Sequence, residues 1–292
     1  MLTKPFLLHA LSPLHAGTGQ AAGIVDLPIA RYRSTGIPFV PGSSIKGVLR
    51  DAWRANGEGE KKPDKLLAVF GPETGNASEH AGALVVGDAR LLALPVRSFR
   101  GTFAWVSSPL LLELARRDLG EVASGLNLPS LAGRAARVTN GSACLFEKKI
   151  YLEDLDLPAQ ADPVCDAWAK FLSPLVSPGE DIFSKRFAVV DDDTMSFLME
   201  TATQLDARVR LDPTTRTVAQ GALWLEESLP PESLLVGLLA ADRSRKEKVE
   251  MTAREVLDFA LAKETVLQLG GKATVGRGRC RMVPIAGAGA ER

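Results

Sequence analysis

The sequence has few cysteines and no long apolar segment. Its three cysteines, among 292 residues, are widely spaced and form no CxxC pair. This pattern excludes a disulfide framework and a CxxC-type zinc site, and it predicts buried thiols. No apolar run approaches the roughly 20 residues that a membrane helix requires. The N-terminal stretch KPFLLHALSPLHAG is too short and too interrupted for a signal peptide. We therefore expect a cytoplasmic protein with no membrane partner.

A net charge is also missing, because 35 lysines and arginines balance 35 aspartates and glutamates. The overall charge therefore gives no sign of a nucleic-acid partner. Two stretches are nevertheless locally basic, namely residues 31–54 and the glycine-rich residues 270–282. The neutral total thus conceals two candidate anion sites.

Several catalytic motifs are absent as well. GKAT lacks the glycine that a P-loop places five residues before Gly271, since Val266 stands there. GTGQAAG is one residue too long for GxGxxG and is not followed by a helix. The three histidines lack HxxxH or HExxH spacing, and no GxSxG elbow occurs. The sequence therefore argues against NTPase, dinucleotide-binding and histidine-metal sites.

The order of elements predicts an α+β fold. Strands are expected in residues 5–11 and 82–96, and helices are expected to start at Ser108-Pro109, with Gly120 as the stop, and at Asp162-Pro163. Further elements are a strand in 233–241, a helix at about 252–263 and a pair of strands around the glycine-rich residues. Long insertions separate these elements, unlike the regular alternation of a doubly wound sheet.

A hairpin is predicted in the second half of the chain. QLDARVRL, residues 204–211, alternates strictly, with leucine, alanine and valine on one side and charged residues on the other. DPTTRT follows as a turn and VAQGALWLEE as a return strand, so Arg216 stands at the apex. The pattern indicates a half-exposed strand.

The stretch PGSSIKGVLRDAWRAN, from Pro41, predicts an amphipathic helix with a basic second face. Ser43 or Ser44 can cap it, and the free amides of its first turn, with Lys46 and Arg50 nearby, would suit a phosphate. An ordinary surface helix with a basic outer face explains the same pattern.

LGGKATVGRGRCRM places glycines around cations. Gly270 and Gly271 permit close approach of backbone amides to a phosphate, while Lys272 and Arg277 supply positive charge. The alternative is a glycine-rich hairpin that ends a sheet.

Two residues near the N-terminus are candidates for chemistry. His15 lies in the glycine-flanked stretch SPLHAGTGQ after the first strand, a place where side chains are displayed, although a lone histidine is more often structural. Asp26 is the single carboxylate in the apolar stretch GIVDLPIAR, and such a residue ordinarily faces water.

Six stretches together resemble the RAMP superfamily of CRISPR proteins. They are LHAGTGQAAGIVDLPIAR, TGIPFVPGSSIKGVLRD, VFGPE, GALVVGDARLLALPVRS, GALWLEESLPPESLL and LGGKATVGRGR, which together reach from residue 14 to residue 279. VDLPI and LPPESLL narrow the resemblance to the repeated backbone subunit of the type III-B effector, the Cmr complex. It implies a single domain, 1–292, with a ferredoxin-like, RRM-related palm and large insertions. An inserted helical region is expected at roughly 55–175, a protruding β-hairpin at roughly 203–225 and a glycine-rich loop at 270–278.

The resemblance also implies a function. Copies of the subunit would line up along a guide RNA beside other Cmr subunits and cut complementary single-stranded target RNA. Asp26 matches the position of the family's cleaving aspartate and would hold a divalent metal ion, Mg²⁺, or a 2′-hydroxyl. His15, Glu226 and Glu227 are candidate assistants. The guide backbone would be held by Ser43, Ser44, Lys46, Arg50, Gly270, Gly271, Lys272 and Arg277, and we expect the helix start and the glycine loop to form one groove.

Three other interpretations stay open. The chain could be a purely structural RNA-binding scaffold in which Asp26 is a solvated loop residue. It could be the equivalent backbone subunit of a type III-A complex. A guide-processing RAMP nuclease is the least favoured, because the long C-terminal half with LWLEESLPPESLL does not suit it.

Overall fold

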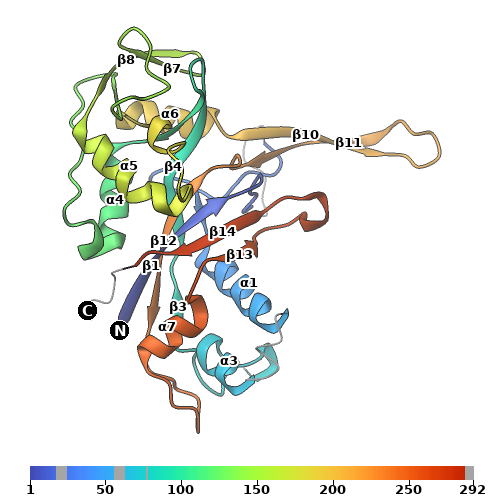
Figure 1. Ribbon diagram of the computed structural model, residues 1–292. Helices are drawn as coiled ribbons and strands as arrows, with labels where there is room; N and C mark the ends of the chain where they lie inside the picture. The colour runs from blue at the N-terminus through green and yellow to red at the C-terminus, as the bar shows by residue number, and fades with distance from the viewer. Residues whose placement is uncertain (18–24, 56–62, 77, 287–292) are drawn as a thin grey trace.

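A computed structural model describes residues 1–17, 25–55, 63–76 and 78–286 (Figure 1). Residues 18–24, which belong to the first stretch quoted above, and 56–62, which belong to the expected insertion, lie outside the described residues. Within the described part of the chain, no helix has the length and apolar character needed to cross a membrane.

The structure mixes strands and helices along the whole chain. The first strands are β1 (Leu2–Ala10), β2 (Phe39–Val40), β3 (Leu84–Val86), β4 (Ala89–Ser98), β5 (Thr102–Ser107), β6 (Ala136–Val138) and β7 (Lys149–Leu152). The later strands are β8 (Leu155–Ala161), β9 (Phe187–Val190), β10 (Gln204–Leu211), β11 (Val218–Ser228), β12 (Leu234–Ala241), β13 (Thr265–Gln268) and β14 (Arg279–Pro284). The α-helices are α1 (Gly42–Ala55), α3 (Pro63–Phe70), α4 (Pro109–Leu119), α5 (Pro163–Val176), α6 (Asp192–Thr201) and α7 (Ala253–Leu261). Short 3₁₀ helices lie at Thr74–Asn76, Gly120–Ala123, Ser184–Arg186 and Ala273–Val275.

Most strands belong to one large sheet. Its order in the described residues is β13-β14-β1-β12-β4-β5-β9-β6-β8-β7, with β2 beside β4 and β3 beside β12. β1 lies between β12 and β14 and is antiparallel to both. The first and last thirds of the sequence thus meet in the middle of the molecule. The α+β class expected from the sequence is confirmed.

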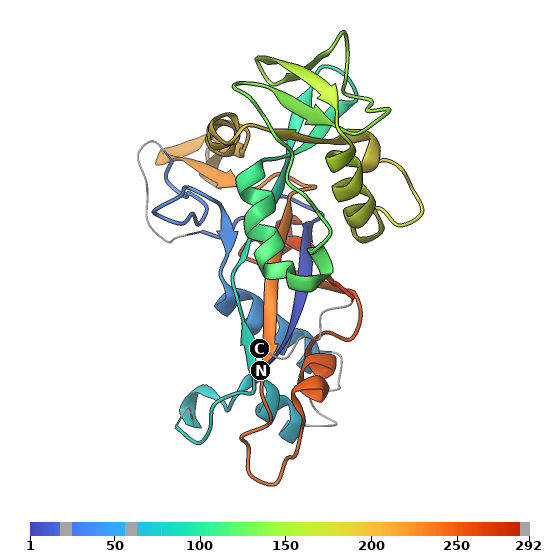
Figure 2. The same cartoon turned by 90° about the vertical axis from the view of Figure 1, so that its left-hand side faces the viewer.

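Helices cover both faces of this sheet. Successive side chains of β1 accordingly point into two apolar layers, one on each face. Phe6 and Leu8 point into the cluster that holds α1, α3 and α7, whereas Leu7 points into the cluster that holds α4 and α5. Figure 2 shows α4 and α5 in front of the sheet strands and α1 behind them. The three cysteines are buried free thiols, as predicted.

Local signals place several helices where the sequence predicts them. Ser108 accepts a hydrogen bond from the Leu111 amide at the start of α4, and Gly120 ends that helix with a φ of 61°. Asp162 caps α5 in the same way. The inserted region expected to be helical is different: it contains β3 to β8 besides α3, α4 and α5. Its strands extend the sheet because β5 pairs with β4 and then with β9.

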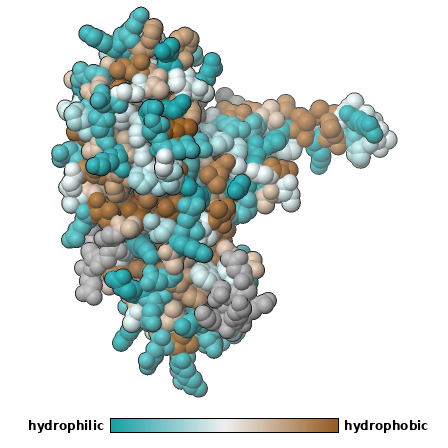
Figure 3. All heavy atoms as spheres, in the orientation of Figure 1, coloured by the Kyte–Doolittle hydropathy of each residue, from teal (hydrophilic) through white to brown (hydrophobic). Residues whose placement is uncertain are grey.

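β10 and β11 form a separate two-stranded sheet that projects from the body (Figure 1). This hairpin covers residues 204–228, against the predicted limits of 203–225, and Arg216 lies in its turn with a φ of 54°. The strict alternation of β10 has an unexpected consequence. Its apolar side chains are the exposed ones, and its charged side faces the body at the root of the hairpin. Figure 3 shows apolar residues along this projecting arm.

Candidate active site at the foot of the hairpin

Asp26 lies where the hairpin joins the body. Leu27 forms a parallel bridge with Glu226 of β11, and its amide donates to the carbonyl oxygen of Leu225 over 3.1 Å. The Asp26 side chain is exposed, and its Oδ2 accepts a hydrogen bond of 2.8 Å from the Leu225 amide. The second oxygen, Oδ1, has no hydrogen-bond partner among the described residues. Among the described residues, one carboxylate oxygen is therefore fixed and the other is left without a protein partner.

Glu227 holds the segment of Asp26 against the hairpin. Its buried carboxylate accepts hydrogen bonds from the Ile29 amide at 3.1 Å, from Arg31 at 2.5 Å and from the Thr203 hydroxyl at 2.9 Å. Arg31 also donates to the Met199 carbonyl oxygen. Through these hydrogen bonds Glu227 fixes the segment that carries Asp26 against the foot of the hairpin. Sequence reasoning noted Arg31 only as part of a basic stretch, and no signal pointed to Thr203.

His15 contacts β11 two residues beyond the point where Asp26 contacts it. Its Nδ1 is 2.6 Å from the Glu227 carbonyl oxygen. A carbonyl oxygen only accepts, so Nδ1 carries the proton of this hydrogen bond, and Nε2 is the nitrogen left to gain or lose a proton. Asp26 contacts Leu225 and His15 contacts Glu227, which sets the two anchor points about 7 Å apart along the strand. The structure brings both predicted residues to one place.

Glu226 is surrounded by cations. It is fully buried and pairs with Lys272, with Arg277 at 3.2 Å and with Arg208 at 3.8 Å. Arg277 also pairs with Asp206, and the Arg277 hydrogen bond is the main cause that holds the pKa of Asp206 below its usual range. Burial, followed by the nearby arginines, lowers the pKa of Lys272. The predicted RNA-binding cations of the glycine loop are thus paired with acids in this state of the chain.

The glycine turn, residues 270–278, packs against the first loop and the hairpin foot. The Gly278 amide donates to the Pro13 carbonyl oxygen over 2.9 Å, and the Gly270 α-carbon lies against the His15 carbonyl group. Gly270, Gly276 and Gly278 have φ values of 73° to 78°, and Lys272 has a φ of 66°. At Gly270 and Gly278 a Cβ would also meet backbone atoms of His15 and Leu269, so the fold requires glycine at these two positions. The space beside Gly271 is open.

The start of α1 is a second, separate group. Ser43 and Ser44 are exposed but lie inside the helix, so the predicted serine cap is wrong. The Gly42 amide instead donates to Asp88 over 2.8 Å, a contact that the sequence did not indicate. Lys46 donates to the Leu84 carbonyl oxygen at 2.9 Å, and burial, then Arg50, lowers its pKa.

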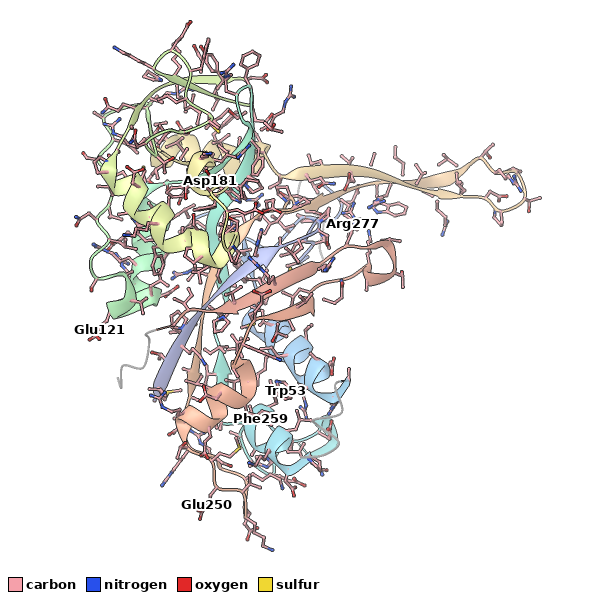
Figure 4. All side chains as sticks on the ribbon, in the orientation of Figure 1. Trp53, Glu121, Asp181, Glu250, Phe259 and Arg277 are labelled. Atoms are coloured by element: carbon pink, nitrogen blue, oxygen red, sulfur yellow. The ribbon has the colours of Figure 1, made fainter. Side chains whose placement is uncertain are left out.

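The two predicted phosphate-binding sites, the start of α1 and the glycine turn, do not contact each other among the described residues. Arg50 donates to the Pro72 carbonyl oxygen and to Glu73, away from the hairpin. α1 begins against β3 and the β3–β4 connection, while its Trp53 stacks on Phe259 of α7 (Figure 4). Across the described ranges, no hydrogen bond or ion pair joins the start of α1 to the glycine turn. The expected common groove stays a prediction.

A metal ion would find few protein ligands here. No group of three or more histidine, cysteine, aspartate or glutamate side chains in the described part of the chain is arranged to hold one. Mg²⁺ commonly takes one or two carboxylates together with phosphate oxygens and water. Asp26, whose Oδ1 has no partner among the described residues, fits such a site, in which the RNA would supply further ligands.

Comparisons with known proteins agree with this architecture. The RAMP superfamily model matches residues 7–281. The CRISPR system Cmr endoribonuclease Cmr4 of Pyrococcus furiosus is 35% identical over 280 residues, which is 93% of this chain and 92% of that protein. The crystal structure of oligomeric Cmr4 from Pyrococcus furiosus has a TM-score of 0.71 at 26% identity, with 98% of each chain covered. A chain of the type III-B Cmr-beta complex bound to cognate target RNA has a TM-score of 0.73 at 20% identity, with 98% of each chain covered, which concerns the fold alone. The chain therefore belongs to the RAMP superfamily and, within it, to the Cmr4 family.

Proposed function

We propose that this chain is the backbone subunit of a type III-B CRISPR effector in the cytoplasm and that it cleaves target RNA with Asp26. The observation that carries the proposal is the position of Asp26. It is an exposed carboxylate at the root of a projecting hairpin, with one oxygen fixed and the other without a partner among the described residues. The family relative from Pyrococcus furiosus is named an endoribonuclease, which supports the reaction type.

The palm of the family is assigned to one part of the sheet. β1, α1, β4, β12, α7 and β14 follow one another as βαββαβ, and the sheet order of the strands is β14-β1-β12-β4. This order supports a ferredoxin-like palm. α1 and α7 lie on the same face, as that topology requires.

In the proposed reaction, Asp26 acts on a phosphodiester of the target strand. Asp26 Oδ1 would orient the 2′-hydroxyl, or would help to hold a divalent metal ion, so that the hydroxyl oxygen approaches in line. When bound, Mg²⁺ would neutralise charge on the phosphate. The 2′-oxygen loses its proton and bonds to phosphorus while the bond to the 5′-oxygen breaks and that oxygen gains a proton from water. His15 Nε2 is a candidate acceptor for the first proton, and Glu227 keeps the loop in place.

The guide strand is proposed to lie on the start of α1 and the glycine turn. The resemblance assigns guide phosphates to Ser43, Ser44, Lys46, Arg50, Gly270, Gly271, Lys272 and Arg277, and of these Ser43, Ser44, Gly270 and Gly271 are exposed in the structure. Other copies of this chain and further Cmr subunits complete the complex in this proposal. The oligomeric Cmr4 crystal structure supports contact between copies.

A non-catalytic scaffold is the alternative, and one substitution separates the two functions. Complexes assembled with Asp26→Asn should bind target RNA normally and leave it uncut. Asp154→Asn is the matched control, because Asp154 is also exposed and is distant in the sequence from the hairpin foot. Undiminished cleavage by the Asp26→Asn complex would favour the scaffold or another catalytic residue.

A further inference from the structure

Two acids face each other across the foot of the hairpin. In the register of β10 and β11, Asp206 is directly opposite Glu226. Like charges at directly opposed positions destabilise a strand pair. Glu226 is fully buried, so water does not screen this repulsion effectively. The hairpin therefore needs positive charge close to both acids.

Arg277 supplies that charge from the glycine turn. One guanidinium nitrogen is 3.2 Å from Glu226 and 2.8 Å from the Ser228 hydroxyl, and the other pairs with Asp206. Arg277 is only 7% exposed and lies between the hairpin and the turn (Figure 4). A guanidinium presents several donors in a fixed plane, which suits a bridge between two carboxylates. Lys272 and Arg208 add charge beside Glu226 from the same two elements.

The Arg277 bridge connects the glycine turn, which is assigned to the guide RNA, with the segment of Asp26, which is assigned to the target RNA. Leu225, which precedes Glu226, donates to Asp26, and Glu227, which follows it, accepts from the Ile29 amide. Three consecutive residues of β11 therefore hold the carboxylate of Asp26, the glycine turn and the segment that carries Asp26. A displacement of Glu226 would move both neighbours, because the three share one strand.

We propose that Arg277 is a positioning residue, which sets the glycine turn and the Asp26 carboxylate at a fixed distance through the buried bridge to Glu226 and Asp206. The proposal rests on the function proposed above for Asp26. It assigns Arg277 a different role from phosphate binding: the guanidinium is occupied by the two acids and is withdrawn from solvent. Guide phosphates held at the turn and target phosphates cut at Asp26 are thereby kept in register.

The first test measures the bridge without any RNA. Arg277→Met leaves Glu226 buried and short of a partner, whereas Glu226→Gln with Arg277→Met removes both charges. We expect each single variant to lower the thermal midpoint of the chain. We expect the double variant to lose less than the two single losses combined. Arg279→Met is the matched control, since the exposed Arg279 is two residues away and should leave the midpoint unchanged. Strictly additive losses in the thermal midpoint would overturn the proposal that these residues form a bridge.

The second test uses the assembled complex with guide and target RNA. A cation that contacts a phosphate contributes about one unit to the salt dependence of RNA binding. The double variant, which loses the buried Glu226 charge together with its Arg277 partner, should keep the wild-type salt dependence. Its single-turnover cleavage rate should fall about tenfold or more, since small misplacement of a reacting group is costly, and its cuts should spread to neighbouring positions. A salt dependence reduced by one unit, or wild-type rate and cut positions, would overturn the positioning role.

The same cleavage assay tests the proposed function of Asp26 independently of the positioning role of Arg277. If Asp26→Asn cuts normally, the proposed function fails, and the thermal midpoints still report on the bridge. If Asp26→Asn abolishes cutting while the double variant of Glu226 and Arg277 cuts as the wild type does, only the positioning role fails.

Discussion

The α-carbon of Gly270 lies so close to the carbonyl group of His15 that a Cβ built at Gly270 would come within 2.2 Å of that oxygen. Gly270 also has a φ of 73°, a backbone angle that residues other than glycine rarely adopt. Gly270→Ala should therefore destabilise the chain by more than the roughly 1–3 kcal/mol of backbone strain alone. Gly271→Ala is the matched control, because its side of the turn is open. Denaturant unfolding of both variants checks the difference, and equal stabilities would contradict the contact.

The apolar face of the hairpin is expected to serve assembly and not folding. Leu223 is 65% exposed and pairs across the hairpin with Val209, which is 47% exposed. Leu223→Ser should change the stability of the isolated chain by no more than about 0.5 kcal/mol. It should weaken formation of the RNA-bound complex, because exposed apolar surface of this kind commonly marks an interface. Unfolding curves and mass measurements of assembled complexes test both parts. Loss of folding or unimpaired assembly would count against this interpretation.

The stability contributed by Asp206 should depend on pH in the acidic range. The Arg277 hydrogen bond, with smaller help from Gln204 and Arg208, holds the folded-state pKa of Asp206 below its ordinary 3.8. As the pH falls, the unfolded chain binds this proton first, so the stabilisation is complete above the ordinary value and is lost as pH falls through the lower folded value. Asp206→Asn should therefore be less stable than the wild type at pH 7, with a gap that narrows below about pH 4. A gap that stays constant down to pH 3 would contradict the pairing with Arg277.

Cleavage should require a divalent cation, because the Asp26 carboxylate and the phosphate oxygens of the RNA are the kind of ligands that Mg²⁺ prefers. Excess chelator should stop cutting without releasing the target RNA, and added Mg²⁺ should restore it. Target retention is measured in the same reaction as its control. Cleavage at full rate in chelator would remove the metal from the mechanism.

Local signals in the sequence were sufficient for many of the elements. Ser108, Pro109 and Gly120 delimit α4 because the cap and the stop act within one or two turns of the helix. Thr252 and Glu255 similarly form a capping box at the start of α7. Such contacts join residues close in sequence, so their spacing alone reveals them.

Contacts between distant residues were not predictable in the same way. The bridges from Arg277 to Glu226 and Asp206 span 51 and 71 residues, and the Asp88 cap of α1 spans 46. The alternation of β10 identified two faces, but the usual rule that the apolar face is buried fails once a strand leaves the main sheet. One further signal was available: a hairpin register would have placed Asp206 opposite Glu226, which calls for a cation.

The most direct test of the central claim is the single-turnover cleavage rate of prebound target RNA in complexes that carry Asp26→Asn. Loss of a positioned catalytic group commonly costs about a hundredfold or more in rate. We expect a loss of at least that size with target affinity unchanged, while Asp154→Asn keeps the wild-type rate. An Asp26→Asn rate within about twofold of the wild type, with target fully bound, would contradict the assignment of cleavage to Asp26.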